Sequence, residues 1–171
     1  MSRKTAIWLS GGSALVIYLT MITIHLSNPE MAPCGFEPQL AFTGYSLGEL
    51  RYFILDMPPE FWPVYTRSLL LIDPAFAVLF GIWVWLVNRD MTPVLAIAAA
   101  LACGILDVTE NLAIWTEFRV MPYVTGIDIP VCELWAGGAL APAAGFTILK
   151  FGAYAVAIGL TLWNLRQRRM V

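Results

Sequence analysis

Ionisable side chains stand inside stretches of the chain that are otherwise almost entirely apolar. They are Asp73, Asp107, Glu110 and Lys150, and the amide of Asn111 lies beside them in the sequence. A charged side chain in hydrocarbon is unfavourable by several kcal/mol unless it is paired or faces water. The chemistry open to such groups is ion pairing, proton binding or contact with a charged ligand. These residues form the candidate polar cluster of the protein.

Their spacing indicates how they meet. Asp107, Glu110 and Asn111 are three and four positions apart, so they share one face of a helix. Lys150 and Tyr154 share a face of another helix for the same reason. At a rise of about 1.5 Å per residue, the carboxylates and the lysine lie at similar depths, about two turns from one membrane surface. We therefore expect Lys150 to be the counter-ion of Asp107 or Glu110.

The charges of this cluster do not balance, because three carboxylates face one lysine. Arg67 lies near the start of the second apolar stretch and could reach toward the site. Otherwise a carboxyl group is protonated, or water or a cation supplies the balance. In addition, Asp73-Pro74 predicts a kink, because proline removes a helical hydrogen bond.

Three interpretations of the cluster remain open: an ion-pair network that fixes helix packing, a ligand or proton-linked site, and a metal site. His25 is the only histidine, and no Glu-x-x-His or His-x-x-x-His spacing occurs. Lys150 would also repel a bound cation. We expect no metal and no cofactor, with His25 as a possible contributor to the polar cluster.

Four apolar stretches position these residues. They cover about residues 6–26, 68–87, 93–115 and 143–165, and each has the length of roughly 20 residues that a membrane-spanning helix needs. Of the 171 residues, 59% are hydrophobic and only 13% are charged, against about 25% charged in soluble domains. The sequence predicts a single all-α membrane domain over residues 1–171, a four-helix bundle. It does not predict a nucleic-acid binder.

The basic residues predict the orientation. Arg3, Lys4, Arg89 and the arginines of the C-terminal tail all flank the spans on one side, which the positive-inside rule makes cytoplasmic. Asn88-Arg89-Asp90 predicts a tight turn on that side. We expect both termini in the cytoplasm and two long loops outside, over residues 27–67 and 116–141.

The first outer loop contains a predicted helix. Ser46 and Glu49 have the spacing of a capping box, apolar residues follow at helical intervals, and Pro58-Pro59 ends the pattern. This predicts a short amphipathic helix that caps the bundle. The alternative is a lid over a site or a docking surface.

The three cysteines fall in different places. Cys34 and Cys132 lie in the two outer loops, on the oxidising side, and are a candidate disulfide. The alternative is two unrelated thiols. Cys103 lies within the third span and is expected to be a small core residue.

Several of these residues together resemble a known group of proteins. The segment Gly44-Tyr45-Ser46, the Asp-x-x-Glu-Asn motif at Asp107–Asn111, and Lys150 in the fourth span are similar to those of an uncharacterised family of small bacterial four-span inner-membrane proteins. The resemblance covers most of the chain. It implies a four-helix fold in the bacterial inner membrane and no particular activity.

The sequence contains no recognisable catalytic set, so it does not favour an enzyme, and an enzyme acting on a lipid remains a third alternative. The sequence favours an accessory or assembly subunit of a larger membrane complex, in contact with lipids and with other subunits or a second copy of itself. The alternative is a small-ligand, lipid or proton-linked site formed by the intramembrane carboxylates and the lysine.

Overall fold

The protein is described by a computed structural model that covers residues 1–31, 36–120 and 141–169. Within these ranges the regular secondary structure is helical. The longer helices are α1 (Arg3–Ser27), α2 (Leu47–Asp56), α3 (Trp62–Arg67), α4 (Asp73–Asn88), α5 (Pro93–Val120) and α6 (Pro142–Arg169). A π-helical turn, η5 (Ser68–Ile72), joins α3 to α4, and short 3-10 turns lie at η1 (Pro29–Met31), η3 (Pro38–Leu40) and η4 (Pro59–Phe61).

Four helical segments are long and apolar enough to cross a membrane. They run over Arg3–Ser27, Pro59–Asn88, Pro93–Arg119 and Pro142–Gln167. The four stretches predicted from hydropathy lie inside these segments. The prediction of an all-α bundle with four membrane-spanning helices is therefore confirmed.

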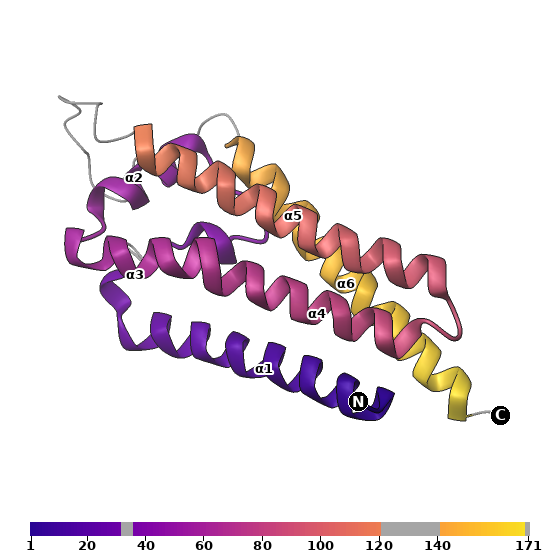
Figure 1. Cartoon of the computed structure of the whole chain (residues 1–171). Coiled ribbons are helices and arrows are strands. Elements are labelled where there is room, and N and C mark those ends of the chain that lie inside the picture. Colours follow the sequence, from indigo (N-terminus) through magenta and orange to yellow (C-terminus); the bar gives the residue numbers. More distant parts are fainter. Residues whose placement is uncertain (32–35, 121–140, 170–171) are drawn as a thin grey trace.

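The four long helices lie side by side along one direction (Figure 1). Helix α4 packs against α1 and α5, and α5 packs against α6. The start of α1, the end of α6 and the α4–α5 connection lie at one end of the bundle, which we call the terminal end. Helix α2 lies at the opposite end, the α2 end. The two termini are thus on the same side, as an even number of spans requires.

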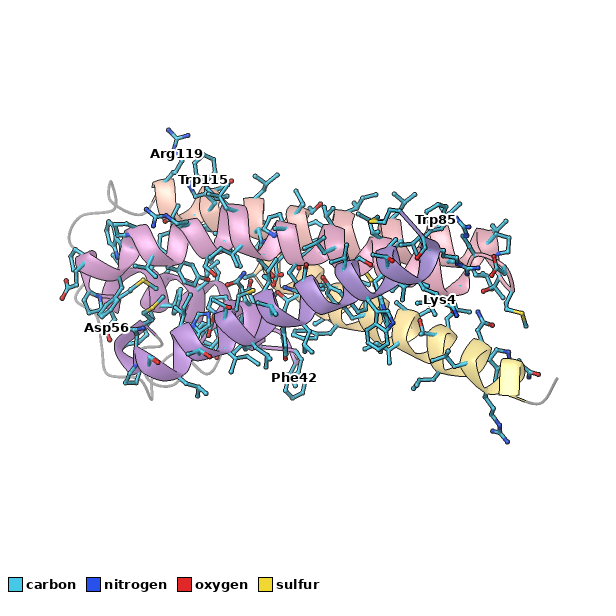
Figure 2. All side chains as sticks on the ribbon, turned by 60° about the horizontal axis from the view of Figure 1, so that its bottom comes forward. Lys4, Phe42, Asp56, Trp85, Trp115 and Arg119 are labelled. Carbon is cyan, nitrogen blue, oxygen red and sulfur yellow. The ribbon has the colours of Figure 1, made fainter. Side chains whose placement is uncertain are left out.

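Aromatic and basic side chains mark both ends. Trp115 and Arg119 lie toward the α2 end, whereas Trp85 and Lys4 lie toward the terminal end (Figure 2). The Arg119 guanidinium is 4.9 Å from the centre of the Trp115 ring. Tryptophan and basic residues favour the two membrane–water interfaces, so this placement agrees with a bundle that crosses the bilayer.

The helix before Asp73 is irregular. Over Ser68–Ile72 it widens into a π turn, in which the backbone N–H of Asp73 donates to the carbonyl of Ser68. Pro74 follows directly and has no N–H to donate, so the regular α-helical pattern cannot run through this point. The sequence predicted a kink at Asp73-Pro74, and the structure places a π turn immediately before it. This turn fixes where the Asp73 side chain enters the bundle.

Helix α2 begins with the predicted capping box. The Ser46 hydroxyl accepts a hydrogen bond from the backbone N–H of Glu49 at 3.1 Å, and the Glu49 carboxylate accepts from the N–H of Ser46 at 2.6 Å. Two N–H groups that would otherwise lack helical partners are satisfied in this way. The helix ends at Asp56, just before Pro58-Pro59.

The apolar face of α2 closes the α2 end of the bundle. Leu50, Phe53 and Ile54 are almost completely buried. The Phe53 ring lies 5.1 Å from Tyr65 and 6.3 Å from Phe118, between centroids. Burying side chains of this size contributes roughly 1.5–3 kcal/mol each. Helix α2 is therefore a cap on the bundle, as the simpler prediction proposed.

Near the terminal end, amide and hydroxyl side chains join α4, the α4–α5 connection and α6. The Asn164 amide donates to the Asn88 side-chain oxygen and to the Thr92 hydroxyl, both at 2.8 Å. The Asn88 amide in turn donates to the Thr161 hydroxyl at 2.9 Å. We call Asn88, Thr92, Thr161 and Asn164 the amide network. Asn88 is therefore a buried helical residue, not part of an exposed turn.

The predictions for the three cysteines have different outcomes. Cys103 is buried in the core between α4, α5 and α6, as expected. Cys34 and Cys132 lie outside the described residues, so their disulfide stays a prediction.

Candidate functional site

The predicted polar cluster comes together from three helices. Asp73 lies at the start of α4, directly after the π turn, Asp107, Glu110 and Asn111 line one face of α5, and Lys150 comes from α6. All five side chains are buried, with residue exposures of 0% to 5%. The i, i+3, i+4 spacing on α5 and the charges within apolar spans were the signals that identified them.

Lys150 is the centre of the cluster. Its Nζ forms an ion pair with Oε2 of Glu110 and lies 3.4 Å from Oδ1 of Asp107 and 4.0 Å from Oδ2 of Asp73. The other carboxylate oxygen of Glu110 accepts a hydrogen bond from the Thr147 hydroxyl, one turn before Lys150 on α6. Glu110 therefore has two strong donors, whereas Asp107 has one longer contact.

A residue from the first loop completes the cluster. Nε2 of Gln39, in the 3-10 turn η3, donates to Oδ2 of Asp73 at 2.7 Å and to Oδ1 of Asn111 at 3.2 Å. Asn111 also donates to Oδ2 of Asp73, at 3.0 Å. Asp73 thus accepts two amide donors in addition to its contact with Lys150. The sequence interpretation missed Gln39, because a loop has no periodicity to show which way its side chains point.

Several buried polar atoms at the cluster have no hydrogen-bond partner among the described residues. They are Oδ2 of Asp107 and Oε1 of Gln39 within the cluster, and the hydroxyl oxygens of Tyr45 and Tyr154 beside it. A buried polar group without a partner is unfavourable by about 1–3 kcal/mol. A network whose only role is packing is expected to satisfy its members. The cluster therefore has unused capacity to bind a proton, water or a ligand.

The three possible contributors lie in different surroundings. Nε2 of His25 is 3.0 Å from Oε1 of Glu37, so His25 pairs with the loop and not with the carboxylate cluster. The Arg67 side chain is exposed. Tyr154 follows Lys150 by one turn on α6, and its ring packs edge-on against Phe80 at 5.0 Å. Only Tyr154 thus lies next to the cluster.

Tyr45 lies in the core at the α2 end of the bundle, near Thr147 and Glu110. It is 2% exposed, and its backbone carbonyl accepts from the N–H of Ala141 at 2.9 Å. Burial raises the pKa of the Tyr45 hydroxyl well above its usual range, although the Thr147 hydroxyl beside it acts in the opposite direction. The raised pKa keeps the Tyr45 hydroxyl in its neutral form.

Two cavities among the described residues lie away from the cluster. A groove of about 670 Å³ runs between α4 and α5, and a pocket of about 220 Å³ lies near Glu117 at the α2 end. Neither is lined by a residue of the cluster. Within the described ranges, no three His, Cys, Asp or Glu side chains are arranged to hold a metal ion, and Lys150 fills the position between the carboxylates.

Comparison with protein-family models, curated proteins and solved structures finds no match to the chain. The fold and the site define a multi-pass, all-helical membrane protein with a buried carboxylate–lysine cluster.

Proposed function

We propose that this chain is a proton-linked membrane protein, in which the carboxylate–lysine cluster binds and releases a proton. One observation carries the proposal. Three buried carboxylates surround a single ammonium group, and Oδ2 of Asp107 has no partner in the described part of the chain. Ionised, the four groups would sum to two uncompensated negative charges inside the bundle.

The contacts of the three carboxylates indicate where a proton is held. Glu110 as an anion is stabilised by Lys150 and by the Thr147 hydroxyl. Asp73 as an anion is stabilised by the amides of Gln39 and Asn111. Hydrogen bonds to the charged form favour ionisation. Asp107 has the least support, with Lys150 at 3.4 Å as its contact, so Asp107 is the proposed proton carrier.

A proton fits this site better than a larger ligand does. The side chains of the cluster are buried, and Lys150 lies between the carboxylates. A proton needs no cavity, and its uptake by one carboxyl reduces the charge imbalance directly. Buried acidic groups within membrane spans commonly serve proton relays, which supports the same interpretation.

The proposal includes a location and an orientation. Arg3, Lys4, Arg89 and Arg166 lie toward the terminal end, which the positive-inside rule places in the cytoplasm. The cluster then lies nearer the outer surface, below the first loop. The resemblance to small bacterial inner-membrane proteins supports a bacterial inner membrane.

A hydrophobic carbodiimide tests the proposed function, because it reacts with protonated carboxyl groups in apolar surroundings. The purified protein in lipid nanodiscs is labelled at several pH values, and the modified residue is found by mass spectrometry. We expect an adduct within the cluster that decreases as the pH rises and is lost in Asp107→Asn. Glu117→Gln, on the same helix outside the cluster, is the matched control and should leave the adduct unchanged. Absence of any adduct on Asp73, Asp107 and Glu110 would falsify the proposal.

A second function is an accessory subunit of a membrane complex, which the groove between α4 and α5 favours. Its floor includes the small residues Ala77, Gly81, Ala100 and Gly104. Nothing lies within 4 Å of a Cβ built at Gly104. Small residues let a partner's membrane-spanning helix approach closely. Native mass spectrometry of protein extracted in mild detergent tests this function. A stoichiometric partner that is bound to the wild type and lost in Gly104→Leu supports it. A lone chain in both the wild type and Gly104→Leu contradicts it.

A further inference from the structure

Part of the first loop is buried in the bundle. Between α1, which ends at Ser27, and α2, the side chains of Gln39 and Tyr45 are buried, and Phe36 and Ala41 are partly buried against the core, whereas Leu40 and Phe42 are exposed. Figure 2 shows Phe42 part-way along the helices, well away from Asp56 at the α2 end. The Phe42 ring lies 6.4 Å from that of Phe151, the residue after Lys150. The loop thus reaches the depth of the cluster.

Gln39 is a buried polar residue of this loop. It is 5% exposed, and its amide nitrogen bonds both Asp73 and Asn111. Two amides donate to Oδ2 of Asp73, and Gln39 is the one that comes from the loop. Oε1 of Gln39 has no partner among the described residues. The side chain is therefore held by its contact with Asp73 and Asn111.

Two contacts hold the loop in place on either side of Gln39. On one side, Glu37 pairs with His25 at the end of α1, with Nε2 and Oε1 separated by 3.0 Å. On the other side, the carbonyl of Tyr45 accepts from Ala141, just before α6. The loop is thereby attached to the first and last spans, and Gln39 lies between these attachments.

We infer that Gln39 is the specificity-determining residue at the outer entrance of the proton site. It occupies the position on Asp73 that water or a hydrated cation would take, so protons reach the carboxylates and solvated cations do not. The inference rests on the proposed function, since it concerns access to the same carboxylates. It assigns a role to a residue that lies outside the membrane-spanning helices.

Labelling with two different carbodiimides tests this inference separately from the proposed function. A hydrophobic reagent reaches the cluster through lipid, whereas a water-soluble, cationic one must enter from the solution. In nanodiscs, the wild-type cluster should react with the hydrophobic reagent and resist the cationic one. In Gln39→Ala the cationic reagent should modify Asp73, Asp107 or Glu110 several-fold faster. The ratio of the cationic to the hydrophobic reaction rate should rise above that of the wild type, even though loss of the amide that stabilises ionised Asp73 also favours the hydrophobic reaction. Leu40→Ala, an exposed neighbour in the same turn, is the control and should behave as wild type.

A second variant keeps the test decisive if Gln39→Ala does not fold. Gln39→Asn retains the amide but shortens the side chain by one methylene, which moves it away from Asp73, and it should also admit the cationic reagent. The inference is overturned if the cationic reagent labels the wild-type protein as fast as it labels the Gln39 variants. It is also overturned if the hydrophobic reagent labels the wild type and the Gln39 variants but the cationic reagent labels none of them. If neither reagent labels the cluster in any protein, the proposed function fails and this inference fails with it.

Discussion

The bundle contains two buried polar layers that are built in opposite ways. The amide network of Asn88, Thr92, Thr161 and Asn164 is neutral, and its side-chain amides each donate at 2.7 to 2.9 Å to well-placed oxygens. The carboxylate cluster is charged, and Oδ2 of Asp107 and Oε1 of Gln39 lack partners in the described chain. One layer uses its hydrogen-bonding capacity, whereas the other leaves part of it open.

This difference separates a packing role from a functional one. Neutral interhelical hydrogen bonds stabilise membrane bundles modestly, by about 0.6 kcal/mol on average, without a penalty for buried charge. A cluster with three carboxylates and one ammonium has a much larger electrostatic imbalance, which packing alone does not require. The stability of the carboxylate cluster should therefore depend on pH, and that of the amide network should not.

The largest effect is expected at Lys150. Lys150→Met keeps the length of the side chain but removes the charge that faces Asp73, Asp107 and Glu110. Removing one partner of a buried ion pair typically destabilises by about 3–5 kcal/mol. The loss should be smaller at low pH, where protonated carboxyl groups no longer repel one another. Unfolding titrations with a denaturing detergent in mixed micelles, at two pH values, measure this.

Lys4→Met serves as the control for this measurement, because Lys4 is exposed near the terminal end. It should change the free energy of unfolding by no more than about 0.5 kcal/mol. A loss at Lys150→Met that is the same at both pH values would contradict the charged character of the cluster.

The next largest effect is the difference in the free energy of unfolding between variants of two acidic residues on the same helix. Glu110→Gln weakens bonds from Lys150 and Thr147, and hydrogen bonds to charged groups are worth about 1.5–3 kcal/mol. Asp107→Asn removes one like charge and loses only the contact at 3.4 Å. We expect the first variant to be destabilised by about 2 kcal/mol and the second to be as stable as wild type or more stable. Equal losses in the same titration would show that the two acids are equivalent, against the proposed role of Asp107.

The sequence predicted one polar layer well and the other poorly, for physical reasons. Asp107, Glu110 and Asn111 share a helix face by spacing alone, and their charge in an apolar span is conspicuous. The buried position of Asn88 was hidden by its neighbours Arg89 and Asp90, which make the segment look like an exposed turn.

Gln39 and Arg67 show where sequence patterns fail to predict the position of side chains near the ends of spans. The position of Gln39 depends on how the first loop folds back against α6 and brings this side chain to Asp73 and Asn111, which no local pattern encodes. Arg67 precedes the π turn, and the rotation of that turn decides whether it points inward; it is exposed. Tertiary path and helix irregularity, not residue type, set these two positions.

A smaller effect is expected in the amide network. Asn164→Ala leaves the Asn88 side-chain oxygen and the Thr92 hydroxyl without their donor, and should lower the free energy of unfolding by about 1–2 kcal/mol. The same titration at the two pH values used for Lys150→Met should give the same loss, because the contacting groups do not titrate. A pH-dependent loss would show that the two layers are coupled.

The smallest effect is expected at Thr161, whose hydroxyl accepts from Asn88 on a neighbouring helix and donates to Ala157 on its own. Thr161→Val removes the interhelical bond with little change in volume, and should lower the free energy of unfolding by about 0.6 kcal/mol. Thr20→Val is the matched control, because the exposed Thr20 bonds only the carbonyl of Val16 one turn away. The difference between the two variants, measured at both pH values, isolates the interhelical bond. If Thr161→Val is no less stable than its control, the amide network contributes little to packing, and its contrast with the carboxylate cluster rests on charge alone.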